Sequence, residues 1–525
     1  MRNHLLRRAK ASCQFSLVPV ISLSLFLGLS PALMQATRAD ENQTDSPKTV
    51  PPPDAHAAQV VQGYRVEVAV PDLNFPTSLE FDGEGNLLIA EAGKVPGYQQ
   101  AKPRILRIDS AGQQDVLIDA GLESPVTDLL WYNSRLYISH RGKISVWEAG
   151  RLQDIVTGLP SLGDHQNNQI TAGPDGKLYF GQGTATNSGV VGPDNAKMGW
   201  LKKHPEFHDV LPMDLAKKSN LKTRVFASPN PLTDFKGDTR LTSAFAPFGE
   251  VRGDKPLHGE TKANGTILRM DPDGSHLEVY AYGFRNPFGV LWGTKERLYA
   301  TENGFDVRGS RPIANDWEDL YAVKKGGFYG WPDFGSGVPV SDPHFEPMKK
   351  GMEKPKMLFR EHPPVELPLH QFPKHSAIAK LDVSPGGAFG YEGQLFIAFY
   401  GHWTPMTGQP PKEHGGHRVV RFNPRGGGVE EFFSQAHNQH FSSQKSSMKK
   451  SSSPSDSGGH AASGHQMSPG PRRPIDVRFA PDGAALYIVD FGALEVSPQG
   501  QMTAYPNTGV VWKIVPTIAA NRADD

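Results

Sequence analysis

A short apolar run recurs six times along the chain, and each copy begins with leucine followed by aromatic or aliphatic residues. Five of the six copies follow a turn rich in Gly, Asp or Asn, which is the pattern that separates short β-strands. The six runs are Leu87-Leu88-Ile89, Leu136-Tyr137-Ile138, Leu178-Tyr179-Phe180, Leu298-Tyr299-Ala300, Leu395-Phe396-Ile397 and Leu486-Tyr487-Ile488. Because a repeated pattern marks a repeat architecture, the sequence predicts six copies of one β unit.

A second strand pattern follows each run in the same order. These second strands are Ile105-Leu106-Arg107-Ile108, Ile144-Ser145-Val146-Trp147, Ile267-Leu268-Arg269-Met270, Leu320-Tyr321-Ala322-Val323, Val419-Val420-Arg421-Phe422 and Val510-Val511-Trp512-Lys513-Ile514. The leucines of the first three runs are 49 and 42 residues apart, close to the period of about 40 to 50 residues of a propeller blade. We therefore predict an all-β fold, a six-bladed β-propeller with long inserted loops, over residues 63–516. A row of β-sandwiches is the alternative, and the constant strand order disfavours it.

The ends and insertions of the predicted propeller have their own patterns. The alternating segment Tyr64–Val68 is expected to add a strand to the last blade and close the ring, which removes exposed sheet edges. An insertion over about 184–261 falls within blade three and is a candidate cap on the substrate side. A second insertion over about 434–471 is rich in Ser, His and Lys and is expected to be disordered. Its histidines favour a solvated loop over a metal site; they are His437, His440, His460 and His465.

The N-terminal residues have the pattern of an export signal. Basic residues precede a largely apolar stretch over 15–33, and Thr37-Arg38-Ala39 offers a small-residue cleavage site. We predict an export signal over 1–39, with an uncleaved membrane anchor as the alternative. Residues 40–62 are polar and rich in proline and predict a flexible tether, and 517–525 form a tail. A periplasmic or secreted protein is expected in either case.

Composition narrows the classes of partner and of chemistry. The 55 Lys and Arg residues balance the 55 Asp and Glu residues, so no net charge favours nucleic acid, and a small-molecule partner is expected. The single cysteine, Cys13, lies in the predicted signal. The mature chain therefore has no disulfide, no thiolate metal site and no Cys-x-x-Cys-His haem attachment. Redox chemistry would need a dissociable cofactor.

Three ionisable side chains share one position in the repeat. His165, Arg285 and Arg473 each lie 13 residues before the leucine of their strand run, where residues line the mouth of a propeller channel. Histidine suits the removal of a hydroxyl proton near neutral pH, and the neighbouring Asp164 is expected to orient its ring. Arginines recognise planar carboxylates. This combination is suited to an acidic, flat cofactor beside an alcohol substrate.

From about Gly63 to Val515 the chain resembles the soluble glucose/sorbosone dehydrogenases, which use pyrroloquinoline quinone (PQQ) on a six-bladed propeller. The segments that carry the resemblance are Leu159-Pro160-Ser161 with Asp164-His165-Gln166, then Tyr282-Gly283-Phe284-Arg285-Asn286-Pro287, Glu302-Asn303-Gly304-Phe305 and Gly326-Gly327-Phe328-Tyr329-Gly330-Trp331-Pro332. The resemblance implies that His165, assisted by Asp164, takes the hydroxyl proton while hydride passes to PQQ. It also implies that Arg285 and Asn286 contact PQQ.

The resemblance further implies a calcium ion held by the backbone carbonyls of Gly304 and Phe305 beside the cofactor. A proline is usual in the family where Phe305 stands, but a carbonyl ligand tolerates the exchange because Ca²⁺ needs only oxygen. An acidic group composed of Asp316, Glu318 and Asp319 is a candidate for a second, structural calcium, and an acidic turn is the other interpretation.

The chain departs from the family pattern in three blades. The cofactor-binding lysine expected after the inner strand of blade five is replaced by Tyr400-Gly401-His402, which leaves His402 as a partial substitute. Blade six keeps Arg473, but Ile475 replaces the second arginine of the family's pair. Blade two has Thr127-Asp128 at the mouth in place of the family's Gly-Gln segment.

The expected function is PQQ-dependent oxidation of a sugar or a related alcohol or aldehyde. Without a haem site, the reduced cofactor would pass electrons to an external cytochrome or quinone. A calcium-dependent lactonase-type hydrolase is one alternative, in which Asp128, Asn168, Glu302 and Asn303 would surround a metal that polarises an ester carbonyl. A non-catalytic propeller that binds glycans or proteins is the other.

Overall fold

The computed structural model describes residues 50–517, except for 214, 216–223, 234, 236, 253–256, 295–296, 349–351, 405–415 and 437–466. The predicted export signal, the first part of the predicted tether, residues 518–525 of the tail and the four histidines of the second insertion lie outside the described residues. No helix within the described part of the chain is long and apolar enough to cross a membrane.

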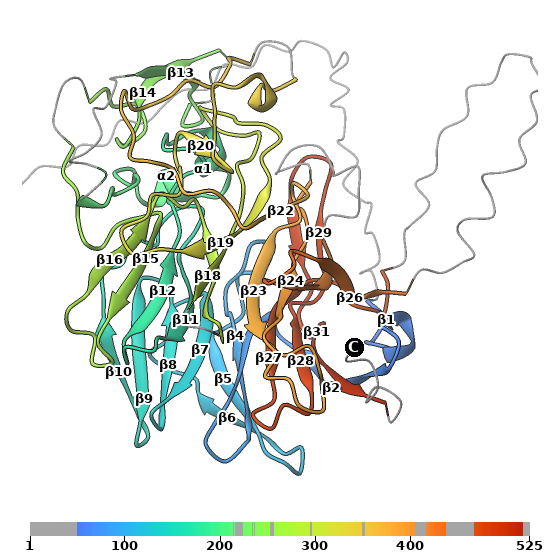
Figure 1. Cartoon of the computed structure of the whole chain (residues 1–525). Coiled ribbons are helices and arrows are strands. Elements are labelled where there is room, and N and C mark those ends of the chain that lie inside the picture. The colour runs from blue at the N-terminus through green and yellow to red at the C-terminus, as the bar shows by residue number, and fades with distance from the viewer. Residues whose placement is uncertain are drawn as a thin grey trace, which may run out of the picture. The chain divides into compact units, whose positions relative to one another are not determined.

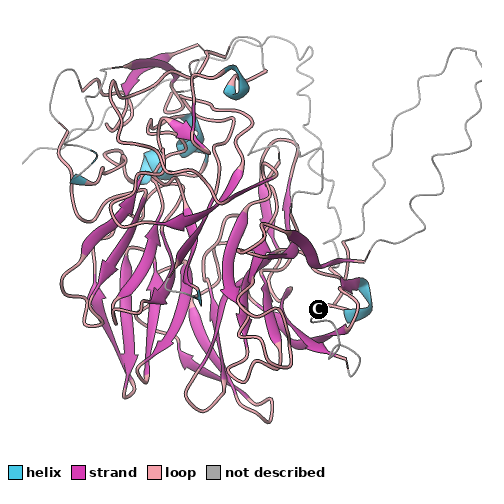
Figure 2. Ribbon diagram, in the orientation of Figure 1, coloured by secondary structure: helices cyan, strands magenta, loops and turns pink. Residues whose placement is uncertain are grey.

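Six antiparallel sheets form the body of the fold, and strands with connecting loops make up nearly all of the described chain (Figures 1 and 2). Blade one contains β3 (Pro76–Phe81), β4 (Leu87–Glu91), β5 (Arg104–Ile108) and β6 (Gln114–Ile118). Blade two contains β7 (Val126–Tyr132), β8 (Arg135–His140), β9 (Lys143–Glu148) and β10 (Arg151–Val156). Blade three contains β11 (Asn167–Ala172), β12 (Leu178–Gln182), β15 (Thr266–Met270) and β16 (Glu278–Tyr282).

The other three blades repeat this order with additions from the N-terminal part of the chain. Blade four contains β17 (Pro287–Trp292), β18 (Leu298–Glu302), β19 (Glu318–Val323) and β22 (His370–Phe372). Blade five contains β23 (Ile378–Val383), β24 (Leu395–Phe399), β25 (Arg418–Phe422), β26 (Val429–Gln435) and β1 (Ala58–Val60). Blade six contains β27 (Pro474–Phe479), β28 (Leu486–Asp490), β31 (Gly509–Pro516) and β2 (Tyr64–Leu73). The six-bladed propeller predicted from the sequence is confirmed.

Burial differs between the inner and outer strands of a blade. Strands β3 and β27 are buried along their whole length because neighbouring blades cover both faces. The outermost strands β6 and β10 are largely exposed. The repeated leucine runs lie on the second strands, such as β4 and β28, which are also largely buried. Burial explains why these runs are continuously apolar, whereas the outermost strands carry no such signal.

The ring closes in the way that the sequence predicted. Each inner strand contacts the inner strand of the next blade, and β27 of blade six contacts β3 of blade one. Strand β2 pairs with β31, with Tyr64 opposite Pro516 and Val68 opposite Trp512. The outer strand of the last blade therefore comes from the start of the propeller, so the first and last parts of the repeat lie in one sheet.

Ordered structure begins earlier than Tyr64, which corrects the predicted tether over 40–62. Residues 55–57 form a 3₁₀ turn, and β1 pairs with β26, with Ala58 opposite Gln435. The small apolar side chains of Ala58 and Val60 pack against the largest core cluster. This short strand is hidden in the sequence because its three residues are too few to show a period.

The insertions place additional elements at one end of the blades. The blade-three insertion contains α1 (Pro193–Lys197), α2 (Trp200–Lys203), β13 (Val225–Pro229) and β14 (Thr239–Ser243). Blade four adds β20 (Phe334–Gly335), β21 (Val338–Pro339) and the 3₁₀ helix η3 (Pro343–Phe345), and blade six adds β29 (Leu494–Val496) and β30 (Met502–Ala504). Figure 1 shows α1, β13, β14 and β20 together beyond one end of the blade strands.

Candidate active site

The His165 side chain lies in the loop that leads into β11. Its backbone N–H donates to the carbonyl of Thr184 at 3.1 Å, and its ring Nδ1 lies 3.0 Å from the same oxygen. A carbonyl can only accept, so Nδ1 carries the proton and Nε2 has a free lone pair. Burial, together with the nearby Arg285 and Arg308 guanidinium groups, lowers the pKa of His165 well below 6.5. The ring is therefore neutral at neutral pH.

A tight backbone turn brings His165 next to the Arg285-Asn286 segment of blade four. The N–H of Thr184 donates to the carbonyl of Arg285 at 2.9 Å. A Cβ atom added at Gly183 would lie 2.4 Å from His165 Cβ and 2.6 Å from Asn286 Oδ1. Because only glycine fits there, residues 183–184 fix the spacing between the predicted base and the predicted cofactor contacts.

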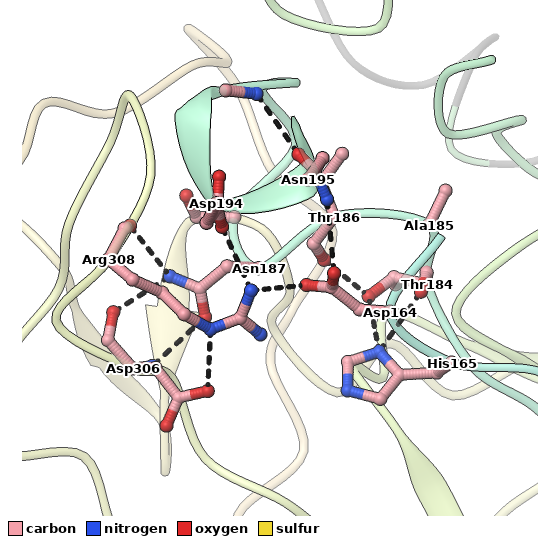
Figure 3. A network of polar contacts seen from close by, with 12 residues as sticks. Asp164, His165, Thr184, Ala185, Thr186, Asn187, Asp194, Asn195, Asp306 and Arg308 are labelled. Atoms are coloured by element: carbon pink, nitrogen blue, oxygen red, sulfur yellow. Dashed lines mark hydrogen bonds and ion pairs between the residues drawn. The ribbon is translucent and has the colours of Figure 1, made fainter. Parts of the chain in front are cut away.

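Asp164 does not orient the His165 ring, contrary to the prediction. Its carboxylate lies 2.7 Å from Arg308 Nη1 and accepts a hydrogen bond from Asn195 at 3.0 Å (Figure 3). The chain bends at Asp164, before β11 begins, and adjacency in the sequence does not bring the two side chains together. Burial raises the pKa of Asp164 to about 6, although Arg308 opposes the shift. The Thr184 carbonyl takes the role predicted for Asp164.

Arg308, which the sequence analysis missed, joins three carboxylates around this loop. Its guanidinium lies 2.7 Å from Asp164, 2.8 Å from Asp194 and 3.0 Å from Asp306 (Figure 3). Burial raises the pKa of Asp306, but Arg285 and Arg308 lower it further, so its net shift is downward. A signal was present in the sequence, because Arg308 follows the Glu302-Asn303-Gly304-Phe305 segment by only three residues.

The Arg285 and Asn286 side chains are buried and already hydrogen-bonded. Arg285 Nη2 lies 2.8 Å from Asp306 Oδ2. Asn286 donates to Asn303 Oδ1 at 2.8 Å and accepts from Asn168 at 2.9 Å. The structure therefore brings Arg285 and Asn286 beside His165, as predicted. Their hydrogen bonds hold both side chains in place before any ligand binds.

The four residues of the hydrolase alternative do not form an open cage. Asp128 is fully buried in the propeller axis and forms a 2.6 Å ion pair with Lys380, instead of lying at the mouth. Glu302 accepts the backbone N–H groups of Arg285 and Asn286. These carboxylates are occupied by protein donors, which weakens the lactonase interpretation.

Arg473 and His402 come together from blades six and five. The guanidinium of Arg473 donates to the carbonyls of Tyr400, His402 and Leu494 at 3.3 to 3.5 Å and lies 4.9 Å from the Tyr400 ring centroid. It is 7% exposed, and burial lowers its pKa. The Asp490 carboxylate accepts the backbone N–H of Arg473 at 2.8 Å, and its charge opposes this shift. Among the described residues no carboxylate forms an ion pair with the guanidinium itself.

His375 is a second histidine at this end of the propeller that sequence reasoning missed. Its Nδ1 lies 3.8 Å from Asp306 Oδ1, and its charge interactions reach both Arg285 and His402. Burial lowers the pKa of His375, and Arg285 adds to the shift. Its φ of 59° is unusual for a residue other than glycine. Asp306 thus lies within 4 Å of both Arg285 and His375.

Among the described residues, no lysine of blade five lies at the mouth after β24, and Lys412 in the following loop is outside the described residues. Lys380 lies on the inner strand β23 and is fully buried in the axis. Its ammonium group lies 2.6 Å from Asp128 and 3.5 Å from Asp476. Lys380 therefore fills the channel and stays out of reach of a ligand at the mouth.

Three buried carboxylates line a narrow cavity beside the predicted calcium segment. The cavity is bordered by Glu302, Gly304, Phe305, Asp316 and Asp319, and it has room for one water molecule or ion. Burial raises the pKa of Asp319 to about 6 and those of Glu302 and Asp316 well above their usual values. Asp319 Oδ1 is buried and accepts no hydrogen bond from any described residue.

Glu318 does not belong to this group, which corrects the predicted acidic set. It precedes Asp319 on β19, so the two side chains point to opposite faces, and Glu318 accepts from Asn303 at 2.9 Å. No three His, Cys, Asp or Glu side chains of the described residues surround one metal position. Backbone carbonyls would have to contribute, and those of Gly304 and Phe305 accept no hydrogen bond within the described part of the chain.

Comparison with known proteins confirms the resemblance to sugar dehydrogenases. A model of the glucose/sorbosone dehydrogenase family matches residues 243–402. Quinoprotein glucose dehydrogenase B of Acinetobacter calcoaceticus is 23% identical over 190 residues, which cover 34% of this chain and 28% of that protein's length. These matches support an oxidoreductase of the sugar dehydrogenase type. The matched region contains Arg285, Asn286 and His402, whereas His165 and Arg473 lie outside it.

Two solved structures share the fold over most of the chain. The holo form of the pyranose dehydrogenase PQQ domain from Coprinopsis cinerea is 15% identical, covers 89% of this chain and 98% of that domain, and has a TM-score of 0.52. An enzyme of carbohydrate-active family AA12 from Trichoderma reesei is 14% identical, covers 89% of this chain and 99% of that one, and has a TM-score of 0.50. At this identity the likeness concerns the propeller fold.

Proposed function

We propose that the protein, similar over residues 243–402 to the glucose/sorbosone dehydrogenases, is a PQQ-dependent dehydrogenase that oxidises a sugar or a related alcohol or aldehyde. The observation that carries the proposal is the buried Arg473 guanidinium, which has no carboxylate partner in the described structure. A buried cation is costly unless an anion pairs with it. An acidic cofactor at the mouth would supply that anion.

His165 is the base in this proposal. Its Nδ1–H is held by the Thr184 carbonyl, so the neutral Nε2 is available to accept a hydroxyl proton. Burial, together with the neighbouring guanidinium groups, keeps the pKa of His165 low. An anionic ligand beside Arg285 would offset these charges and raise the pKa of His165 toward the range that an effective base requires.

Residues of three blades would hold the cofactor. Arg473 and His402 would bind carboxylates from one side, and Arg285 with Asn286 would bind polar groups from the other. PQQ, when bound, supplies the acceptor for the hydride that leaves the substrate carbon. The hydrogen bonds of Asn286 to Asn168 and Asn303 keep its side chain in one orientation.

We assign Ca²⁺ to the acidic cavity beside Gly304 and Phe305. Calcium is bound by oxygen ligands, including carboxylates and backbone carbonyls. Asp319 Oδ1 and the carbonyls of Gly304 and Phe305, which accept no hydrogen bond from a described residue, fit this preference. Asp316 would reinforce the site, because its carboxylate accepts the Phe305 N–H at 2.8 Å and so links the carbonyl segment to the acidic group.

The proposal includes an extracytoplasmic location and an external electron acceptor. The N-terminal sequence, with its basic residues and apolar stretch, supports export to the periplasm or medium. Because the chain after residue 39 contains no cysteine for a haem attachment, electrons would leave to a separate cytochrome or quinone.

The test is dye-coupled turnover of the full chain, loaded with PQQ and Ca²⁺, on a panel of aldoses and alcohols. Replacing the base in His165→Ala should lower turnover by about 10² to 10⁴-fold. The matched control is His276→Ala, a histidine with 79% side-chain exposure in the turn between β15 and β16. Parent turnover in His165→Ala, or equal losses in both variants, would refute the role of His165.

A further inference from the structure

The backbone segment that holds the candidate base is anchored by a carboxyl group from the blade-three insertion. Asp209 lies between α2 and β13 and is only 1% exposed. Its Oδ1 accepts the backbone N–H groups of Ala185 at 2.6 Å and Thr186 at 3.4 Å. Thr186 Oγ1 donates to Asp209 Oδ2 at 2.5 Å. One buried side chain therefore binds three donors of two adjacent residues in the turn that follows β12.

The same turn holds the His165 ring. The carbonyl of Thr184 accepts both the backbone N–H and the ring Nδ1–H of His165. The Thr184 hydroxyl donates to the carbonyl of Thr186 at 2.7 Å, which ties the two ends of the turn together. Figure 3 shows residues 184–186 beside the His165 ring. Asp209 and His165 thus bind neighbouring groups of one short, buried segment.

Asp209 is itself fixed in place by blade three. The N–H of the next residue, Val210, donates to Asn264 Oδ1 at 2.9 Å, and the Asn264 N–H donates to the Val210 carbonyl at 2.8 Å. The Asn264 side-chain amide also donates to the carbonyl of Gly183 at 2.8 Å. Asn264 lies just before β15. The carboxyl group therefore has a set position relative to the turn that it binds.

The chemistry of this carboxyl group identifies its conservative replacement. Burial raises the pKa of Asp209 to about 7, although its hydrogen bonds to Thr186 and Ala185 oppose the shift. The protonated carboxyl can still accept the two N–H groups with one oxygen and donate to Thr186 Oγ1 with the other. Asparagine has the same arrangement of acceptor and donor. Alanine has neither.

We propose that Asp209 is a positioning residue for His165, which holds residues 184–186 so that the Thr184 carbonyl stays on Nδ1 of the ring. The partner of one ring nitrogen decides which nitrogen carries the proton. Asp209 thereby keeps Nε2 available to accept the substrate proton. The inference rests on the proposed role of His165 as the base. It gives the blade-three insertion a part in the reaction beyond that of a cap.

The direct test is NMR of the cofactor-free full chain with isotope-labelled histidine, because the shifts of the ring nitrogens identify the protonated one. The His165 signals are those that disappear in His165→Ala. The parent should carry its proton on Nδ1. Asp209→Ala should move His165 to a mixture of tautomers or to Nε2–H, whereas Asp209→Asn should keep the tautomer of the parent.

Steady-state kinetics with PQQ and Ca²⁺ separate positioning from a general loss of stability. Asp209→Ala should lower kcat at least about tenfold, because a small displacement of a base is costly. KM and PQQ affinity should stay near those of the parent, since Arg285 and Asn286 keep their own partners. Asp209→Asn should recover most of the turnover.

The matched control is Thr242→Val in β14 of the same insertion. It removes a buried hydroxyl that has no hydrogen-bond partner among the described residues, so it should behave like the parent in both measurements. Thr186→Val removes only the hydroxyl that joins Thr186 to Asp209. It should shift the His165 tautomer in the same direction as Asp209→Ala, and it decides the test where Asp209→Ala does not fold.

The tautomer of the parent in folded Asp209→Ala or in Thr186→Val would overturn the proposal. A proton on Nε2 in the parent would overturn it as well. Because the NMR measurement needs no cofactor, the failure of the proposed function is distinguishable: a parent that binds no PQQ but shows the expected tautomer shifts would refute the dehydrogenase and leave the placement of the ring by Asp209 standing.

Discussion

Replacing Gly183 by alanine is a direct steric perturbation of the candidate active site. The new Cβ would lie 2.4 Å from His165 Cβ and 2.6 Å from Asn286 Oδ1, whereas carbon atoms in ordinary contact are about 3.5 to 4.0 Å apart. His165 and Asn286 must therefore separate by roughly 1 Å. The φ of Gly183 is not in the left-handed region, so the alanine backbone itself is unstrained and the effect comes from the contact.

A displacement of about 1 Å between a base and its substrate costs on the order of a hundredfold in rate. We expect kcat/KM of Gly183→Ala to fall by about that factor, and the free energy of unfolding to fall by about 1 to 3 kcal/mol from overpacking. Steady-state kinetics and thermal unfolding would measure both. The control is Gly428→Ala, where a Cβ meets no atom within 4 Å. Unchanged kcat/KM in Gly183→Ala would refute the proposed arrangement of His165 and Asn286.

Three further variants test the charges of the structure. Arg473→Met should weaken PQQ binding about tenfold or more, because a charge-assisted hydrogen bond is lost. It should not lower the melting temperature, because the substitution removes a buried cation that has no ion-pair partner. A lower melting temperature with unchanged binding would contradict this prediction. Asp209→Asn tests pH dependence: burial raises the pKa of Asp209 from 3.8 to about 7, so its stabilising contribution is complete below pH 3.8 and is lost as pH rises through about 7. The melting temperature of the parent should therefore fall more between pH 5 and about 8 than that of the variant, and equal slopes would argue against the assignment. Asp319→Asn should lose most of the increase in melting temperature that Ca²⁺ gives the parent, and chelation should reverse that increase in the parent alone; an undiminished increase in the variant would exclude the cavity as the calcium site.

The repeated parts of the fold could be predicted from the sequence, because six similar blades each carry the same apolar runs. The closing strand β2 was also predictable, since its alternation spans several residues. Strand β1 was not, because three residues in a polar and proline-rich context carry no periodic signal. The six blades could therefore be predicted from the repeated pattern. Added strands such as β1 could not, because they are held by a few tertiary contacts that leave no pattern in the sequence.

The candidate site shows the same division. The common register of His165, Arg285 and Arg473 identified the mouth, because the position before each inner strand is set by the blade itself. The partners of these residues come from irregular loops, whose path no periodicity encodes. Arg308 and His375 were missed for that reason. The orientations of Asp164 and Glu318 were misjudged because adjacency in the sequence was taken as adjacency in space.

The most direct test of the proposed function is a calorimetric titration of the cofactor-free full chain with PQQ in the presence of Ca²⁺, with Arg473→Met measured in parallel. The proposed site predicts saturable one-to-one binding at micromolar concentration or below, weakened at least about tenfold in the variant. Absence of saturable binding by the parent, or equal affinity in both proteins, would contradict a PQQ site at the mouth of this propeller.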